Sequence, residues 1–196
     1  MLNLNNPITY TTDEQTTINT VFATKTTGSE RWKDNKTRKI KQRISEHCLK
    51  EQQCYCAFCE GLVSEGDAPI EHISPKGSTP DFVYEPMNLV VSCTRCNSPR
   101  IKGEKPTIVG RVDSVYTNNK FCIVHPRLDN PDQHIVFQDA ERTVFDIPNC
   151  SQTGQNTIAF FKWNNINAYR VRVAAAATRK MSFNQVRLIN EISTYK

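Results

Sequence analysis

Two Cys-x-x-Cys pairs constrain this chain more than any other feature of its sequence. Cys56 and Cys59 form the first pair, and Cys93 and Cys96 form the second. Each pair supplies two thiolate ligands from one tight turn, and four thiolates complete the tetrahedral shell of a structural Zn²⁺ ion. The spacing therefore predicts one zinc site that joins two distant parts of the chain.

A carboxylate, an imidazole and an amide accompany the cysteine pairs. Glu71 and His72 lie side by side between the pairs, and Asn97 directly follows the second pair. Taken singly, Glu71 could be a surface charge and Asn97 a helix cap, but a purely structural zinc site needs none of the three. Imidazole has a pKa suited to deprotonating water, and oxygen ligands suit a divalent ion that also holds phosphate. We predict a catalytic Mg²⁺ or Mn²⁺ held by Glu71 and Asn97, with His72 as general base.

Positive charge is concentrated in two stretches of the chain. The net charge is +5, and residues 31–50 contain eight Lys and Arg against two acidic residues, while residues 95–111 contain five against one. Such patches favour a polyanionic partner such as nucleic acid, although solvated helix faces would have the same composition. The residues predicted to contact nucleic acid are Arg95, Arg100, Lys102 and Lys105.

The sequence carries no signature of export or of membrane insertion. It has no run of about 18 apolar residues, and its first residues have neither a basic start nor an apolar stretch. We therefore expect a cytoplasmic protein, whose eight cysteines are metal ligands and reduced thiols rather than a disulfide framework.

The chain is expected to form three parts. Residues 1–30, rich in Thr and Asn, are predicted to be an extended or weakly ordered segment with a short strand near residues 20–23, and they are a candidate partner-docking segment. Residues 31–110 contain a basic helix and the zinc-stapled core. Residues 111–196 are expected to add short strands and C-terminal helices that pack on this core.

Local patterns place these features on secondary structure. Ser29 is positioned to cap a helix over residues 30–53, with Cys48 on its apolar face as a core residue. Ser98 as N-cap and Pro99 predict a short helix that Gly103 ends. The remaining predicted elements are strands at 68–72 and 88–92, short strands between 107 and 145, a strand at 155–163, and helices at 165–180 and 182–194.

Several further cysteines and histidines are candidate metal ligands. Cys54 could compete for zinc, but a Cys-x-Cys step fits a zinc turn less well than Cys-x-x-Cys. Cys122 alternates with apolar residues and is predicted to be a core residue, while Cys150 has no identified partner. His125, Asp129 and His134 could form another metal site, although a turn containing a hydrogen-bonded histidine is the favoured interpretation.

The ordered motifs resemble a known family. Cys-x-x-Cys, Glu-His-x-x-Pro, Asn-Leu and Cys-x-x-Cys-Asn, followed by Lys-Gly, resemble the HNH endonucleases, whose ββα-metal core lies beside a zinc site in many members. The resemblance implies that His72 activates water, that Asn88 braces the loop and that Asn97 is a metal ligand. Two departures are Glu71, where Asp is commoner, and a longer spacing between Asn97 and Lys-Gly, which would give Arg100 the phosphate contact.

The resemblance implies an α+β fold: a ββα-metal core with a four-cysteine zinc site, an N-terminal helix, a small β region and C-terminal helices. It implies phosphodiester hydrolysis of nucleic acid, with DNA favoured over RNA such as tRNA. Residues 121–135 and 151–164 resemble a bacterial subgroup that includes the nuclease subunit of Septu-type antiphage systems, which works with an ABC-like ATPase and in some cases a retron. A non-catalytic zinc module that binds nucleic acid or serves as a scaffold is the alternative.

Overall fold

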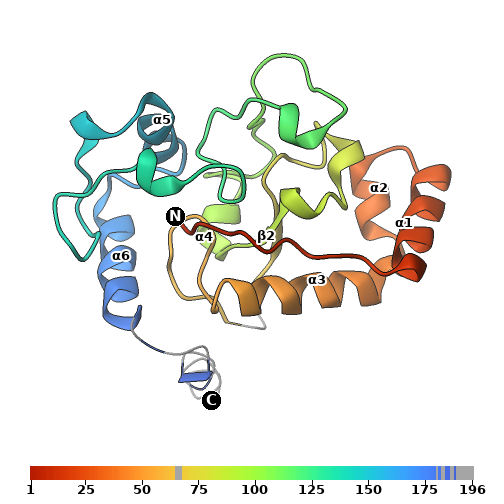
Figure 1. Cartoon of the computed structure of the whole chain (residues 1–196), viewed down its shortest axis with the longest axis horizontal. Coiled ribbons are helices and arrows are strands. Elements are labelled where there is room, and N and C mark those ends of the chain that lie inside the picture. Colours follow the sequence, from red (N-terminus) through yellow and green to blue (C-terminus); the bar gives the residue numbers. More distant parts are fainter. Residues whose placement is uncertain (65–67, 180, 182–183, 186–187, 189–196) are drawn as a thin grey trace.

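The structure is a computed structural model that describes residues 1–64, 68–179, 181, 184–185 and 188. Figure 1 shows helices at both ends of an elongated molecule, with a small sheet and a long helix between them. The elements are α1 (Thr12–Thr24), α2 (Gly28–Lys33), α3 (Arg38–Glu51), β1 (Ile70–His72), β2 (Leu89–Val91), α4 (Thr94–Asn97), α5 (Gln152–Phe160) and α6 (Ile166–Thr178).

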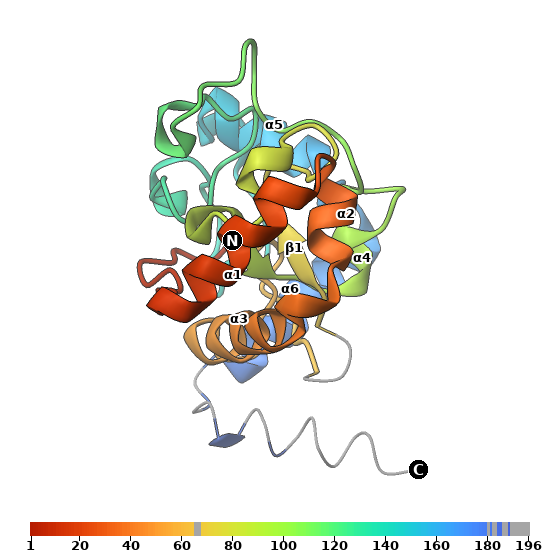
Figure 2. The ribbon, with the colours of Figure 1, turned by 90° about the vertical axis from the view of Figure 1, so that its right-hand side faces the viewer.

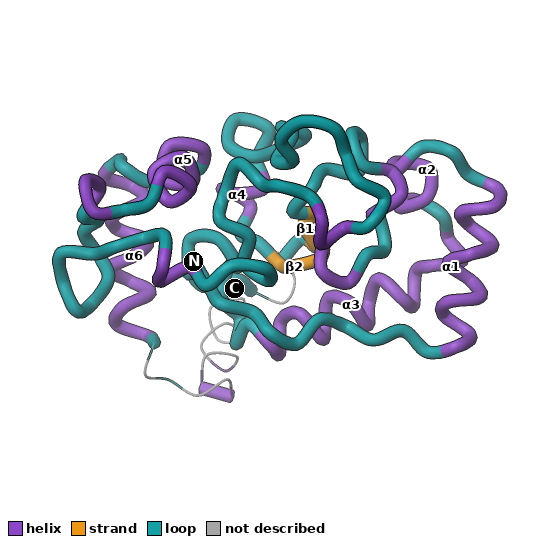
Figure 3. Tube along the Cα trace, turned by 45° about the horizontal axis from the view of Figure 1, so that its top comes forward, coloured by secondary structure: helices purple, strands orange, loops and turns teal. Residues whose placement is uncertain are grey.

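A two-stranded antiparallel sheet lies at the centre, enclosed by loops (Figure 3). β1 pairs with β2 so that Glu71 faces Val90 and His72 faces Leu89. The two predicted strands are therefore confirmed, each in a shorter form. α3 packs against β2, and Cys48 is buried on that helix face, as predicted.

The prediction for residues 1–30 is wrong in its secondary structure, because this segment contains the helix α1. Thr11 and Glu14 form a reciprocal capping box at its start, and four threonine hydroxyls bond to the carbonyl four residues earlier. Threonine is β-branched and has a low helix propensity, which favoured the extended prediction. The cap and the burial of Ile18 and Val21 outweigh that propensity.

The single helix predicted over residues 30–53 is instead two helices. α2 begins at a capping box formed by Thr27 and Glu30, so Ser29 is not the cap. The backbone is extended at Asp34, whose carboxylate then accepts a hydrogen bond from the Lys36 amide at the start of a 3₁₀ turn before α3. A local cap therefore interrupts a hydrophobic pattern that continues across the break.

The predicted strands between residues 107 and 145 are replaced by loops. This region contributes two isolated antiparallel bridges, Ile108 with Phe121 and Phe137 with Phe145. Two 3₁₀ turns interrupt the region, one at Tyr116–Asn118 and one at Pro131–Gln133 that Asn130 caps, and the runs between the turns are too short to extend a ladder.

The strand predicted at residues 155–163 is the helix α5, which Ser151 caps by accepting a hydrogen bond from the Gly154 amide at 3.1 Å. The predicted helix over 165–180 is confirmed as α6. Most of the predicted helix over 182–194 lies outside the described residues. Within the part of the chain that the structure describes, no helix has the length and apolar character needed to cross a membrane.

A buried ion pair connects three segments around the sheet. The Arg127 guanidinium donates to both carboxylate oxygens of Glu51 at 3.1 and 2.7 Å and to the Leu89 carbonyl at 3.1 Å. Its side chain is fully buried, and that of Glu51 is 9% exposed. The end of α3, the start of β2 and the loop at residue 127 are thereby held together.

Removing one partner of this ion pair should destabilise the fold, because a charge would remain buried without its counterion. We expect Glu51→Ala to lower the free energy of unfolding by about 3–5 kcal/mol, measured by chemical denaturation. Glu104→Ala, which breaks the exposed pair between Glu104 and Lys76, is the matched control and should cost less than about 1 kcal/mol. Equal effects of the two substitutions would contradict the structural role of the buried pair.

Candidate active site and metal centre

The four predicted zinc ligands come together in one cluster. The sulfur atoms of Cys56, Cys59, Cys93 and Cys96 all lie within 4.8 Å of one another. The sulfurs of Cys59 and Cys93 are 3.7 Å apart, close to the separation of about 3.8 Å that a tetrahedral shell with Zn–S bonds near 2.3 Å requires. The donor set and its spacing therefore fit a zinc ion.

Each pair of ligands lies on a tight turn. Cys56 and Cys59 occupy a turn closed by a bridge between Tyr55 and Leu62, and the Cys96 amide donates to the Cys93 sulfur at the start of α4. Burial raises the pKa of Cys56, whereas hydrogen bonds with Cys56 and Cys59 lower the pKa of Cys93. A zinc ion binds all four as thiolates, so its binding would release protons.

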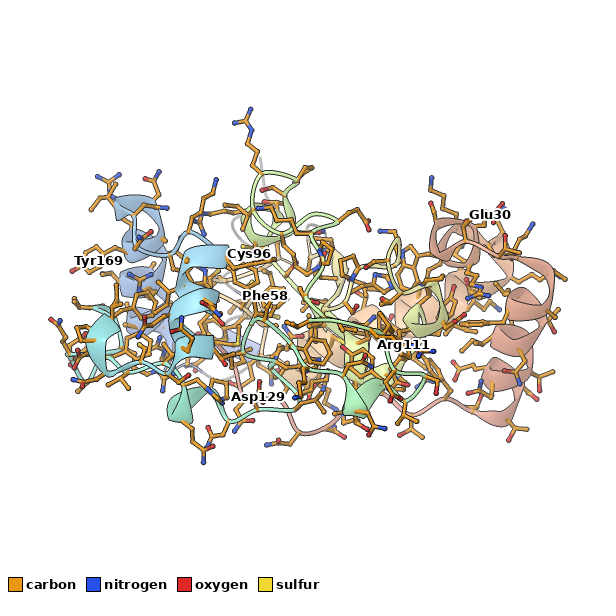
Figure 4. The ribbon with its side chains drawn as sticks, turned by 90° about the horizontal axis from the view of Figure 1, so that it is seen from above. Glu30, Phe58, Cys96, Arg111, Asp129 and Tyr169 are labelled. Carbon is orange, nitrogen blue, oxygen red and sulfur yellow. The ribbon has the colours of Figure 1, made fainter. Side chains whose placement is uncertain are left out.

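Aromatic packing surrounds the cluster on the side of the C-terminal helices. Phe58, between the first two ligands, is fully buried and stacks on Phe161 with ring centroids 4.6 Å apart. Phe161 stacks in turn on Trp163 at 5.1 Å. Figure 4 shows Phe58 and Cys96 in the interior, between the two ends of the molecule. The cluster thus joins the sheet region to the segment that follows α5.

Glu71, His72 and Asn97, which were predicted to share one catalytic site, line one cavity of about 370 Å³, whereas Asn88 does not line it. Glu71 and His72 reach it from β1, and Asn97 reaches it from the end of α4. The structure therefore brings together the three side chains that the sequence analysis assigned to one site. The other residues lining the cavity are Trp32, Ile70, Pro75, Lys76, Pro99, Gly103 and Glu104.

Glu71 forms an ion pair in the interior. Its carboxylate oxygen Oε1 accepts a hydrogen bond from the Lys102 ammonium, and the Lys102 side chain is fully buried. Burial raises the pKa of Glu71, and the Lys102 charge counteracts that rise. Lys102 was predicted to contact nucleic acid, but the structure places it behind Glu71 instead. It balances the charge of the carboxylate and fixes its position.

His72 is buried with a defined ring orientation. Its Nε2 lies 3.1 Å from the Val83 carbonyl, and because a carbonyl only accepts hydrogen bonds, Nε2 carries the proton. Burial, reinforced by the nearby charge of Lys76, lowers the pKa of His72 to about 3. The ring is therefore neutral near pH 7, with Nδ1 unprotonated.

Trp32 is a site residue that sequence reasoning missed. Its ring meets the His72 ring edge-on, with centroids 4.6 Å apart, and it lines the same cavity. Figure 2 shows α2, which carries Trp32, in front of β1. α2 approaches the cavity loop so closely that a Cβ at Gly28 would lie 2.0 Å from the Lys76 carbonyl oxygen. No local pattern connects Trp32 to His72, because the contact is long-range.

Asn88 braces the loop between the strands. Its side-chain Nδ2 donates to the carbonyls of Ser74 at 3.1 Å and Phe82 at 2.9 Å, and its Oδ1 accepts from the Ser74 amide at 2.6 Å. The side chain is fully buried. Both ends of the loop that follows His72 are thus tied to one amide group.

The helix predicted to start at Ser98 is displaced toward the cysteines. α4 ends at Asn97 and is capped by Cys93, while residues 98–103 form turns. The predicted order of strand, loop, strand and helix is nevertheless retained. Asn97, at the end of this helix, is partly exposed at the cavity. The helix begins earlier because the zinc turn itself supplies its N-cap.

The predicted nucleic-acid contacts differ in their surroundings. Arg100 and Lys105 are exposed, and the Lys105 ammonium lies 5.6 Å from the centre of the Phe160 ring. Arg95 is partly buried, and its guanidinium donates to the Lys162 carbonyl at 3.1 Å. Arg100 and Lys105 are therefore the predicted contacts on open surface, while Arg95 also ties α4 to the end of α5.

The other candidate ligands are engaged in structural contacts. The Nδ1 of His125 accepts from the amides of Arg127 and Leu128 at 3.1 and 3.2 Å, and the His134 Nδ1 lies 2.8 Å from the Ser151 hydroxyl. Asp129 accepts from the His125 amide. Among the described residues, the four-cysteine cluster is the only group of three or more His, Cys, Asp and Glu side chains close enough to share a metal ion, so Cys54, Cys122 and Cys150 lie outside any such group.

Comparison with curated proteins shows similarity to two Septu proteins PtuB. The chain is 33% identical to the protein from Bacillus thuringiensis over 82 residues. This aligned region covers 41% of this chain and 27% of that protein. It is 23% identical to the protein from Bacillus mycoides (strain KBAB4) over 159 residues. That aligned region covers 72% of this chain and 52% of that protein. The chain thus matches about a quarter and about half of the length of these relatives. No family model and no solved structure matches the chain.

Replacing a zinc ligand should remove metal and fold together. We expect Cys93→Ala to lose bound zinc and the cooperative thermal transition, because the binding energy of a structural zinc ion is also folding energy. Zinc content by atomic absorption and thermal melting by circular dichroism are the measurements. Cys122→Ala is the matched control, since Cys122 lies outside the cluster, and it should retain zinc. A soluble Cys93→Ala protein with unchanged melting would contradict a structural role for the cluster.

Acid should destabilise the fold through His125. Burial lowers the pKa of His125 to about 3, with a further contribution from Arg127. Because the ordinary value is about 6.5, the unfolded chain binds the proton first, and stability falls as pH drops from 6.5 toward 3. We expect the free energy of unfolding of His125→Gln to depend less on pH in this window, by up to about 1.4 kcal/mol per pH unit. If the free energy of unfolding, measured by chemical denaturation, had the same pH dependence in the wild type and in His125→Gln, His125 would not be the source of the acid sensitivity.

Proposed function

We propose that this chain is a metal-dependent endonuclease of the HNH type, acting as the nuclease effector of a Septu-like antiphage defence complex. The observation that carries the proposal is the convergence of Glu71, His72 and Asn97 on one cavity in a chain that also forms the four-cysteine cluster. The similarity to the Septu proteins PtuB supports the biological setting.

His72 has the geometry of a general base. Its Nε2 proton is held by the Val83 carbonyl, which leaves the Nδ1 lone pair to accept a proton from water. The oxygen of that water attacks the phosphorus atom, the bond from phosphorus to the 3′ oxygen breaks, and the water proton moves to Nδ1. The buried, neutral ring keeps Nδ1 available for this transfer at neutral pH.

Glu71 and Asn97 supply oxygen donors for a hard divalent ion, Mg²⁺ or Mn²⁺. Lys102 binds Oε1 of Glu71, and the second carboxylate oxygen would hold the ion together with the Asn97 amide oxygen. When bound, the ion polarises the scissile phosphate and stabilises the leaving 3′ oxygen. Glu71 is one methylene longer than the commoner Asp, and its ion pair with Lys102 limits the freedom of this longer side chain.

The surroundings of the cavity are suited to a nucleic-acid backbone. Arg100 and Lys105 follow Asn97 in the chain and are exposed, which supports the proposal that they hold phosphates of the substrate backbone. Such contacts carry little sequence information, and DNA and RNA offer the same phosphodiester. We propose DNA as the substrate, with RNA such as tRNA as the second candidate.

A partner subunit is part of the proposal. By the similarity to the Septu proteins, we propose that the chain works with a PtuA-like ATPase of the ABC type, and with a retron in some systems. An unregulated nuclease would damage its own host, so a partner that controls access to the cavity fits this activity. The alternative is a non-catalytic zinc module that binds nucleic acid or serves as a scaffold.

Removal of the imidazole tests the mechanism. In the complex with its ATPase and Mg²⁺ or Mn²⁺, we expect His72→Ala to lower the cleavage rate of plasmid DNA at least about 100-fold, because general-base catalysis contributes at that level. Zinc content and the circular dichroism spectrum should be retained. His47→Ala is the matched control, since His47 lies on α3 and bonds to the Asn6 carbonyl away from the cavity.

The same assay separates the competing functions. Cleavage by His72→Ala at the wild-type rate would show that His72 is not the base. A wild-type complex that binds nucleic acid without cutting DNA or RNA would favour the non-catalytic zinc module. Cleavage of RNA alone would keep the mechanism and change the substrate.

A further inference from the structure

We propose that Tyr116 and His125 are positioning residues that orient Asn88 and, through it, His72. The inference rests on the proposed nuclease function for its catalytic consequence, but the contacts themselves are independent of that function. Neither residue lines the cavity that contains Glu71 and His72. Their effect would pass through a directed chain of buried hydrogen bonds.

The chain of hydrogen bonds begins at a histidine whose proton has a fixed location. The Nδ1 of His125 faces two donors, the amides of Arg127 and Leu128 at 3.1 and 3.2 Å. An atom that accepts hydrogen bonds from both amides carries no proton, so the proton of the neutral ring lies on Nε2. That Nε2 is 2.8 Å from the Tyr116 hydroxyl oxygen.

The proton on His125 Nε2 sets the direction of the next hydrogen bond, between Tyr116 and Asn88. The Tyr116 oxygen accepts a hydrogen bond from the N–H at His125 Nε2, so the Tyr116 hydroxyl donates its hydrogen bond to the Oδ1 of Asn88 at 2.9 Å. Oδ1 also accepts from the Ser74 amide, and Nδ2 donates to two carbonyls. All four hydrogen-bonding positions of the Asn88 amide are therefore used, and the inverted amide orientation would set donors against donors.

The oriented amide controls the position of the general base. Asn88 bonds to the Phe82 carbonyl, and the next residue, Val83, provides the carbonyl that holds His72 Nε2. On the other side, Asn88 bonds to both backbone groups of Ser74, two residues after His72. A rotation of the Asn88 amide would shift the Val83 carbonyl and the backbone at Ser74. It would thereby move the His72 ring, and with it Nδ1, relative to the attacking water.

These hydrogen bonds link two parts of the molecule that are distant in sequence. The segment holding His125 is anchored by Arg127, which binds Glu51 of α3, while Asn88 immediately precedes β2. His125 and Tyr116 are 0% and 4% exposed, so bulk water does not substitute for either bond. The residues after the zinc-stapled core thereby help to define the geometry within it.

Tyr116→Phe removes one hydroxyl and keeps the ring that packs on Phe82. We expect it to lower kcat by about 10- to 100-fold in the cleavage assay with the assembled complex, because small misplacements of a catalytic group have effects of this size. KM should stay within about twofold, since no substrate contact is lost. Tyr84→Phe is the matched control for the loss of a buried hydroxyl and for the Asn88 exchange measurement below: Tyr84 is 3% exposed, and its hydroxyl lies 2.9 Å from the Arg31 carbonyl and 2.8 Å from the Thr37 hydroxyl, away from Asn88.

His125 provides a rescue experiment. Gln can place its amide nitrogen where Nε2 lies and donate to Tyr116, whereas the shorter Asn side chain cannot reach. We expect His125→Gln to retain more of the wild-type kcat than His125→Asn, with similar thermal stability of the two variants. Equal loss of kcat in both variants would contradict an orienting bond from His125 to Tyr116.

A readout independent of cleavage separates this inference from the proposed function. The side-chain amide protons of Asn88, observed by NMR, should exchange faster with solvent in Tyr116→Phe and not in Tyr84→Phe. If the wild-type complex does not cleave but this difference is seen, the nuclease proposal fails and the positioning role stands. If the wild-type complex cleaves and Tyr116→Phe retains kcat, or if its Asn88 exchange is unchanged, the positioning role is overturned.

Discussion

The cysteine cluster is the constraint on which the rest of this structure depends. The sheet consists of two strands of three residues each, and the region between residues 107 and 145 contributes only isolated bridges. Hydrogen bonding between strands therefore does little to hold distant segments together. A structural zinc ion contributes roughly 10–16 kcal/mol of binding energy, comparable to the stability of a whole domain. Through the stacking of Phe58 on Phe161, and of Phe161 on Trp163, the cysteine cluster also contacts the segment that follows α5.

Features encoded by short spacing could be predicted from the sequence. The zinc ligands, the two strands and the assembly of Glu71, His72 and Asn97 in one cavity follow from motifs within residues 56–97. α6 follows from its alanine-rich composition. In each case the determining contacts lie within one element or within the four-cysteine cluster, so the linear pattern contains most of the information that specifies these features.

Features that depend on long-range contacts could not be predicted. α1 forms from a threonine-rich segment because its cap and tertiary burial override propensity, and α5 forms where an apolar run was equally compatible with a strand. Lys102 was assigned to nucleic-acid contact because positive charge clusters around it in the sequence, whereas its partner, Glu71, is buried on β1. The contact of Trp32 with His72 joins segments whose proximity only the completed fold determines.

The two tryptophans of the chain lie at the two centres. Trp32 meets the imidazole of His72 at the cavity, and Trp163 lies in the aromatic stack that begins between two zinc ligands. Each indole is therefore a natural fluorophore for one centre. Two single-tryptophan proteins would separate events that a mixed emission spectrum combines: occupation of the cavity that contains Glu71 and His72, and assembly of the four-cysteine cluster. The intrinsic fluorescence of this molecule thus provides one optical signal for the candidate active site and another for the cysteine cluster.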